Sequence, residues 1–284
     1  MSDVSVRRGV LYVSLAAGAW GTGGAAGSLL FQSSGLGPVG VSLWRYLLGA
    51  AFLFTLVRRT RLDRHMVVVG VGMAIYQTAY FGSIAYAGVA LATVITMGAT
   101  PLFTALGARL FLGERLDRTG ALCITAALAG LLLLTGESAF GASQAGIAGI
   151  GLALFSAAGY AGVTLLSRHR HDDPYGTAVG GFAVGALCLA PFALVGPVLP
   201  EVTVPSVLLL LYLGAVPTAL AYGLYFRSLS ALKATTVSVI SLGEAVGAAL
   251  LGVLLFGERL TPLSLAGCVV LLGAVVALTV HERR

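Results

Sequence analysis

The chain has 284 residues, of which 58% are hydrophobic and only 10% are charged, whereas about a quarter of the residues of a soluble domain are charged. Its formal net charge is +6, but the basic residues lie in short breaks between apolar runs, which argues against a basic face for nucleic acid. The composition therefore indicates a polytopic membrane protein that is embedded in the lipid bilayer. Three cysteines, Cys123, Cys188 and Cys268, each lie inside an apolar run, and this odd number argues against a disulfide framework or a thiolate metal site.

Ten apolar runs follow one another along the chain, and each is long enough to cross the roughly 30 Å hydrocarbon layer as a helix. The runs cover residues 8–31, 38–57, 66–86, 90–111, 117–135, 146–166, 175–195, 205–226, 235–256 and 262–280. Turn-forming and charged residues coincide in the breaks between them. We therefore expect an all-α membrane protein of ten transmembrane helices. The first run is too long for a cleaved signal and should remain as the first span.

Positive charge is distributed unevenly between the two sets of breaks. If the N-terminus lies in the cytoplasm, only Arg259 falls in an outer loop. The basic residues that then fall on the cytoplasmic side are Arg7, Arg8, Arg58, Arg59, Arg61, Arg64, Arg115, Arg118, Arg168, Arg170, Arg227, Lys233, Arg283 and Arg284. The positive-inside rule thus predicts a multi-pass protein of the cell membrane, inner or plasma, with both termini in the cytoplasm.

The two halves of the chain repeat one another. The sequence GERL ends the fourth run at residues 113–116 and the ninth at 257–260, which is 257 − 113 = 144 residues later. Trp20 in the first run corresponds to Tyr160 in the sixth. We expect two five-helix units, residues 1–140 and 141–284. Because five is odd, the second unit enters the membrane from the opposite face, which predicts an inverted repeat of the kind common in transporters.

Glu244 lies in the middle of the ninth run, and its counterpart in the first half is Thr100. An ionised side chain at the bilayer centre costs on the order of 2.5 to 3.5 kcal/mol on insertion scales, so such residues persist mainly beside a cavity or a partner. One interpretation makes Glu244 a solute ligand or proton carrier. The other makes it part of a structural ion pair or hydrogen bond.

Arg45 lies about seven residues inside the second run, roughly 10 Å below its outer end. Its forked guanidinium could anchor the carboxylate of a substrate. Alternatively, Arg45 pairs with Glu244 or with backbone carbonyls near the outer face, and the sequence leaves these possibilities open.

Polar and aromatic side chains mark several other runs as candidate walls of a solute path. The further candidates are Tyr76, Gln77 and Tyr80 on one arc of the third run, Tyr222 in the eighth, and Trp20 and Tyr160. For any single aromatic the alternative is packing or a place in the interfacial belt. The histidines, at 65, 169, 171 and 281, lie in the breaks or the tail, which argues against an intramembrane metal site or a serine–histidine hydrolase. We expect no cofactor and no metal.

The chain resembles the drug/metabolite transporter superfamily, and in particular its EamA-type members, over about residues 8–280. The likeness is carried by Arg45 in LWRYLLGAAF, by Pro101 with the GERL sequence after it, and by Glu244 with its own GERL sequence. The family usually has Glu-Pro in the ninth span, but here Ala245 follows Glu244, so the helix break that Pro101 allows in the fourth span lacks its proline in the ninth. The resemblance implies secondary transport of small organic solutes, often export of amino acids or related metabolites.

Three functional hypotheses follow. The first is a secondary transporter that works by alternating access, with proton exchange at Glu244, and nothing in the sequence resembles a P-loop for ATP. The second is an uncoupled channel or facilitator for small solutes. The third, a membrane-embedded enzyme acting on a lipid-linked substrate, is weaker because only one acid lies deep in a span. We do not expect an enzyme, and a homodimer stays open as an oligomeric state.

Overall fold

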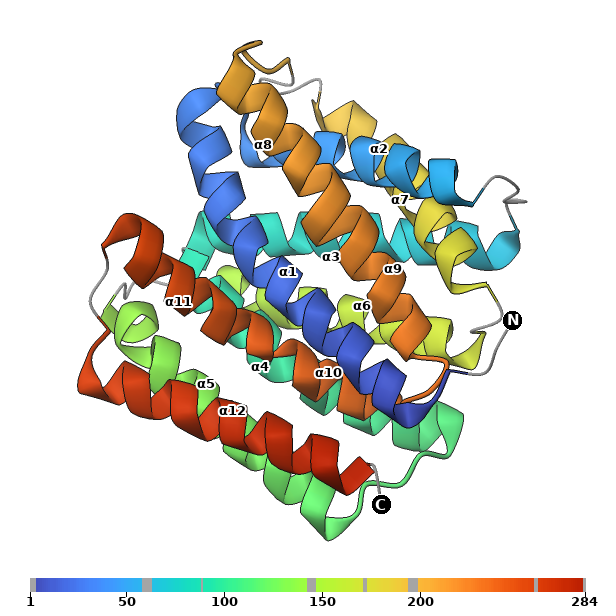
Figure 1. Cartoon of the computed structure of the whole chain (residues 1–284), viewed down its shortest axis with the longest axis vertical. Helices are drawn as coiled ribbons and strands as arrows, with labels where there is room; N and C mark the ends of the chain where they lie inside the picture. Colours follow the sequence, from blue (N-terminus) through green and yellow to red (C-terminus); the bar gives the residue numbers. More distant parts are fainter. Residues whose placement is uncertain are drawn as a thin grey trace.

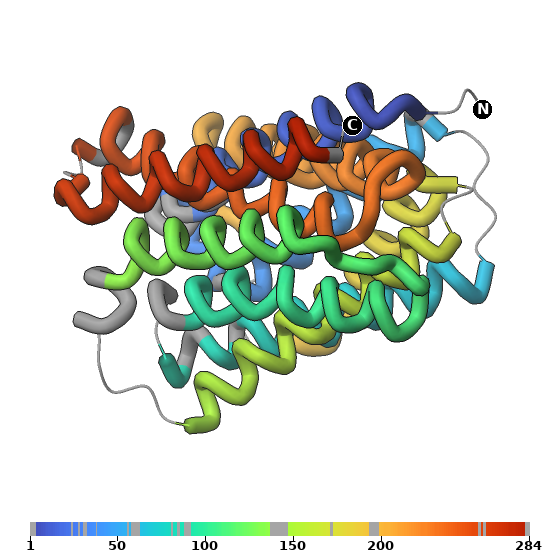
Figure 2. The backbone as a smooth tube through the Cα atoms, turned by 90° about the horizontal axis from the view of Figure 1, so that it is seen from below, coloured from blue at the N-terminus to red at the C-terminus, as the bar shows by residue number. Residues whose placement is uncertain are grey.

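The computed structural model describes residues 4–57, 63–87, 89–141, 147–170, 173–193, 199–257 and 260–282. Within these residues the secondary structure is helical and no strand occurs. The helices are α1 (Val6–Ser33), α2 (Pro38–Leu56), α3 (Arg64–Ala87), α4 (Val89–Gly107), η1 (Ala108–Leu112), α5 (Arg118–Gly141), α6 (Ile147–His169), α7 (Pro174–Ala193), α8 (Val204–Gly214), η2 (Ala215–Leu220), α9 (Ala221–Ser228), α10 (Ala234–Ser241), α11 (Gly243–Phe256) and α12 (Pro262–Glu282). They pack side by side as a bundle, and α1 begins at the end of the bundle where α12 finishes (Figures 1 and 2).

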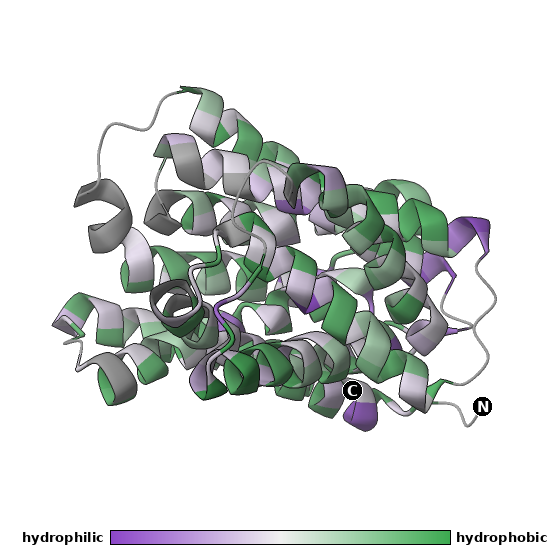
Figure 3. Ribbon diagram, turned by 90° about the horizontal axis from the view of Figure 1, so that it is seen from above, coloured by the Kyte–Doolittle hydropathy of each residue, from purple (hydrophilic) through white to green (hydrophobic). Residues whose placement is uncertain are grey.

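The helices are apolar enough to cross a membrane. Within the described residues, seven of them meet the length and hydropathy expected of a span. Large apolar side chains are exposed along their outer faces, for example Phe111 at 78% and Val269 at 71%, and Figure 3 shows apolar residues along the flanks of the bundle. The chain is therefore a multi-pass membrane protein. The described residues of the ten expected runs lie almost entirely on helices.

Several of the helical segments continue one another. The π-helix η1 follows α4 directly, and α8, η2 and α9 run without a gap from Val204 to Ser228. Only Leu242 separates α10 from α11. Arg259, expected in an outer loop, and His171 lie outside the described residues.

The helix breaks differ from the expectation based on proline. Helix α4 continues through Pro101, whereas the ninth run, which has no proline beside Glu244, is interrupted at Leu242. There the amide of Leu242 donates to the carbonyl of Val239 at 3.1 Å, and the amide of Ala245 donates to that of Leu242 at 3.0 Å. These bonds to the third preceding residue tighten the turn. The interruption makes Glu244 part of the first turn of α11.

The two GERL sequences end their helices alike. Gly113 has a φ of +67° and Gly257 a φ of +66°, a left-handed conformation that glycine adopts without steric cost and that commonly ends helices. In the first copy Gly113 follows η1 directly, and the amide of Glu114, the next residue, donates to the carbonyl of Ala108 at 3.1 Å. The glycine of each GERL sequence therefore ends the helix before it.

The packing of the helices mixes the first and second parts of the chain. Helix α6 packs against α3 and α4, while α1 packs against α8, α9, α10 and α11. Helices α2 and α7 pack together, as do α5 and α12. Each half of the chain is thus covered by the other.

Candidate functional site

A cavity of about 640 Å³ lies between the two halves of the bundle, a size typical of sites for small molecules. All eight candidate residues from the sequence line it, namely Trp20, Arg45, Tyr76, Gln77, Tyr80, Tyr160, Tyr222 and Glu244. They come from α1, α2, α3, α6, α9 and α11. The fold therefore brings together side chains that are up to 224 residues apart in sequence (244 − 20 = 224).

Glu244 reaches the cavity because α11 begins beside it. The positive end of the helix dipole favours a carboxylate in the first turn of a helix. Helix α1 crosses α11 at this point, since a Cβ added to Gly21 would lie 3.0 Å from the backbone oxygen of Glu244 and 3.1 Å from the amide nitrogen of Ala248. Glycine at 21 thus lets the two backbones approach closely, as small residues do between membrane helices.

Arg45 is held by the π-helical turn of η2. Its Nε donates a hydrogen bond to Oγ1 of Thr218 at 2.9 Å, and its guanidinium carbon lies 5.8 Å from the ring centroid of Tyr222, within reach of a cation–π interaction. Thr218 in turn donates to the carbonyl of Leu213, five residues earlier, at 2.7 Å. π-turns often occur at functional sites, and this one directs a hydroxyl at the arginine.

Arg45 and Glu244 do not form a direct ion pair. Among the described residues, no ion pair within 4.0 Å joins the two side chains. The direct pairing that the sequence left open is therefore absent from this conformation. Both charged groups line the same cavity from different helices.

Aromatic side chains form much of the cavity wall and contact one another. The rings of Trp20 and Tyr222 are 4.9 Å apart at an interplanar angle of 66°, and those of Tyr76 and Tyr160 are 5.3 Å apart at 89°. The hydroxyls of Tyr76 and Tyr222 lie 3.3 Å apart, within hydrogen-bonding distance. Trp20 and Tyr160, which the repeat relates, both pack against Tyr225, with ring centroids 5.1 and 6.1 Å away.

Hydroxyl side chains that the sequence analysis did not propose as site residues also line the cavity. They are Ser42, Thr93, Thr96, Thr100, Ser156, Ser238 and Ser241. The spacing of Thr93, Thr96 and Thr100 places them on one face of α4, and Thr93 lies 2.6 Å from the hydroxyl of Tyr80. This three- and four-residue spacing is the signal that could have identified them.

The three histidines that the structure describes do not line this cavity. His65 is in the first turn of α3, and His169 and His281 are at the ends of α6 and α12. In the part of the chain that the structure describes, no group of three His, Cys, Asp or Glu side chains could hold a metal ion.

Comparisons with known proteins agree with this architecture. A model of the EamA-like transporter family matches the chain twice, at residues 7–136 and 147–280. The chain is similar to the uncharacterized transporter YwfM of Bacillus subtilis, with 28% identity over 96% of this chain and 94% of that protein. It is equally similar, at 28% identity over 99% and 98% of the two chains, to the uncharacterized inner membrane transporter YicL of Salmonella typhimurium. A protein of known crystal structure superposes with a TM-score of 0.86 at 21% identity, covering 96% of this chain and 98% of its own, and this likeness concerns the fold alone.

Proposed function

The chain belongs to the EamA-like transporter family, and from that premise we propose that it is a secondary active transporter that exports small organic metabolites, such as amino acids, by alternating access with proton coupling. The single observation that carries this proposal is the cavity between the two halves, into which one acid and one base project without pairing. Within the described lining, Glu244 and Arg45 are its only charged side chains.

We propose that ten helical rods span the membrane as two inverted repeats. When the segments that continue one another are joined, the described residues contain ten rods: α1, α2, α3, α4–η1, α5, α6, α7, α8–η2–α9, α10–α11 and α12. The packing supports the repeat. Helix α6 packs on α3 and α4, and its counterpart α1 packs on the rods that correspond to these, α8–η2–α9 and α10–α11. Helices α2 and α7 pack on each other as counterparts, and so do α5 and α12.

The proposed orientation places the ends of the chain in the cytoplasm. Helix α1 begins and α12 ends at one end of the bundle (Figure 1), and several hydrophilic residues gather at that end (Figure 3). The positive-inside rule assigns this end to the cytoplasm of the cell membrane. The cavity residues of α1 lie in its second half and those of α2 in its first half, whereas Ser238 and Ser241 lie in the first half of the α10–α11 rod. The cavity therefore extends from the outer half of the bundle past its middle.

Glu244 would bind either a proton or the amine of the solute, and Arg45 would bind the carboxylate of the solute. A carboxylate in a low-dielectric site favours either a proton or a cationic group beside it, so a solute amine and a proton would compete for Glu244. Arg45 remains charged at any physiological pH and suits a carboxylate. A solute carrying both groups could then exchange against protons as the halves rock about the cavity.

The test is flux in vesicles that carry Glu244→Gln. A thermal-shift screen of the purified protein against amino acids, purines and organic cations first identifies a stabilising solute. Counterflow of that solute is then followed with and without a pH gradient. We expect Glu244→Gln to abolish the effect of the gradient, while Glu201→Gln, an exposed acid before α8, leaves it unchanged. Wild-type rates and pH dependence in Glu244→Gln would remove this acid from the mechanism. Flux without trans-stimulation would indicate an uncoupled channel.

A further inference from the structure

The GERL acid of the first half, Glu114, joins several helix ends at the end of the bundle where α12 finishes. Its Oε1 accepts from Nε of Arg168 at 3.1 Å, and its Oε2 accepts from the backbone amide of Ala234 at 3.1 Å. Nη1 of Arg168 donates to the carbonyl of Leu229 at 2.6 Å. The network therefore links the end of α4–η1, the end of α6, the segment after α9 and the start of α10.

The bonds of this network are stronger than those of an ordinary surface ion pair. The side chains of Glu114 and Arg168 are 13% and 25% exposed, so water screens them less than it screens fully exposed charges. The amide of Ala234 is one of the first N–H groups of α10, which have no partner within the helix, and a carboxylate at that position is favoured by the helix dipole. Charge-assisted hydrogen bonds of this kind are the strong ones in proteins.

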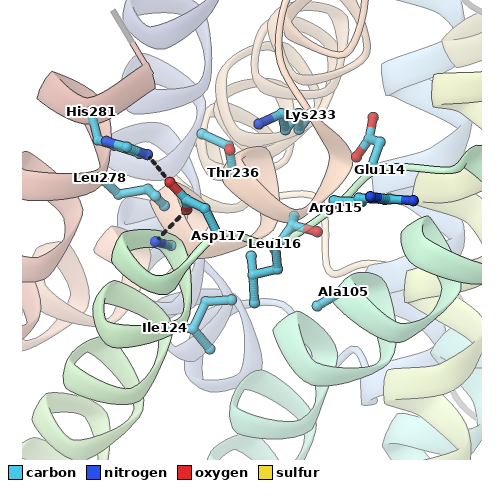
Figure 4. A pocket seen from close by; sticks show the side chains of 12 residues that line it. Ala105, Glu114, Arg115, Leu116, Asp117, Ile124, Lys233, Thr236, Leu278 and His281 are labelled. Atoms are coloured by element: carbon cyan, nitrogen blue, oxygen red, sulfur yellow. Dashed lines mark hydrogen bonds and ion pairs between the residues drawn. The ribbon is translucent and has the colours of Figure 1, made fainter. Parts of the chain in front are cut away.

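The same end of the bundle is otherwise closed by apolar packing. Val10, Phe226, Leu229 and Leu232 are buried there in one cluster. A small pocket also lies there, and Figure 4 shows Glu114 on one side of it and the pair formed by Asp117 and His281 on the other. The large cavity thus extends from the outer half past the middle of the bundle, while the cytoplasmic ends of α6 and α10 are tied to Glu114.

We infer that Glu114 and Arg168 form a cytoplasmic latch that holds the transporter open toward the outside, and that the latch must separate when the cavity opens to the cytoplasm. This inference rests on the alternating access proposed above. It gives the GERL sequence of the first half a role in positioning the two halves, in addition to the helix stop at Gly113. The matching acid of the second half, Glu258, lies outside the described residues.

The latch can be tested without knowing the solute, through the accessibility of two engineered cysteines. In a background that lacks Cys123, Cys188 and Cys268, Gly27→Cys reports on the cavity, because Gly27 lines it and an added Cβ meets nothing within 4 Å. Ala105→Cys reports on the small cytoplasmic pocket. A membrane-impermeant maleimide labels the first in right-side-out vesicles and the second in inside-out vesicles.

Glu114→Gln should slow labelling at position 27 and speed it at position 105, so that the ratio of the two rates changes about tenfold, the effect of losing one hydrogen bond to a charged group. Arg168→Gln should shift the ratio in the same direction, and the double variant should go no further than the larger single effect, because both remove one interaction. Glu114→Asp, which keeps the charge, should restore part of the wild-type ratio.

Two controls separate the latch from a merely structural role. Arg118→Gln and Glu201→Gln, which change exposed charges at the two ends of the bundle, should leave the ratio unchanged. A wild-type ratio in either latch variant that elutes as a single folded species would overturn the inference, and Arg168→Gln provides this test if Glu114→Gln does not fold. The labelling requires no transport, so an unchanged ratio refutes the latch alone, whereas a failure of the Glu244→Gln experiment refutes the proposed coupling alone.

Discussion

Arg45 and Glu244 show how single side chains are kept at membrane depth without a direct counter-ion. Arg45 has a hydroxyl of Thr218 and the face of Tyr222 beside it, and Glu244 has the start of α11. Partial dipoles of this kind stabilise a charge without neutralising it. A charge that is supported in this way remains available to a bound solute, which a closed ion pair would not be.

Asp117 carries a prediction about pH. It accepts a hydrogen bond from the amide of Gly120 at 2.8 Å and contacts Nε2 of His281 at 2.6 Å, so it ties the start of α5 to the last turn of α12. The amide of Gly120 first, and then His281, hold the pKa of Asp117 below its ordinary value of 3.8. A carboxylate whose pKa is lowered by folding stabilises the folded state above its unfolded pKa, and this stabilisation is lost as the pH falls through the folded pKa.

We therefore expect Asp117→Asn to lower the Tm at about pH 5, and the difference from wild type to shrink as the pH falls below the ordinary pKa of aspartate. Thermal unfolding in detergent from pH 7 to pH 3 measures this. Asp63→Asn, at the start of α3, serves as the control for general acid effects. A difference that stays constant down to pH 3 would mean that the charge of Asp117 does not contribute.

At the scale of elements, the close contact between α5 and α12 depends on glycine. A Cβ added to Gly267 would meet the backbone nitrogen of Leu134, and it would lie 2.7 Å from the carbonyl oxygen of Gly130. Backbone atoms cannot move aside as side chains do, so Gly267→Ala should force the two helices apart and cost about 1 to 3 kcal/mol, the usual range for overpacking. Gly273→Ala, on the same helix, adds a Cβ that meets nothing within 4 Å.

The expected outcome is a lower Tm for Gly267→Ala and a Tm close to or slightly above wild type for Gly273→Ala, since alanine favours the helix over glycine. Thermal unfolding of the two purified variants under one set of conditions decides it. Equal values for both variants would show that the crossing of α5 and α12 is looser than the structure indicates.

The helices themselves could be predicted from the sequence, because long apolar runs separated by charged turns leave few alternatives. The interruptions inside them could not. Pro101 is accommodated within α4, whereas the break at Leu242 has no proline and lies where α1 packs closely on the start of α11. The eight candidate residues could also be selected from the sequence. Charged side chains cost free energy within the bilayer, and polar and aromatic side chains are easily recognised within apolar runs. The contact of Arg45 with Thr218 joins residues 173 positions apart and depends on the π-turn of η2. No local sequence pattern predicts this π-turn.

At the scale of the whole molecule, the two halves cover each other rather than forming separate domains. Helix α6 of the second half packs on α3 and α4 of the first, and α1 of the first packs on α9 and α11 of the second. Either half alone would leave these faces, and the polar groups of the cavity, exposed to lipid, which is costly for groups such as Arg45 and Glu244.

We expect neither residues 1–140 nor residues 141–284 to form a stable five-helix unit alone, and we expect the two to assemble when they are expressed together. The division falls just before Gly141, the last residue of α5, so it removes only that residue from a described helix. With an affinity tag on residues 1–140 only, purification from membranes should retain residues 141–284 in close to equal amount, and the complex should unfold in one thermal transition because the two halves share the interface that stabilises each. Recovery of the tagged half as a folded, single species without its partner would contradict this, since it would mean that the contacts of α6 with α3 and α4 contribute little to the stability of the first half.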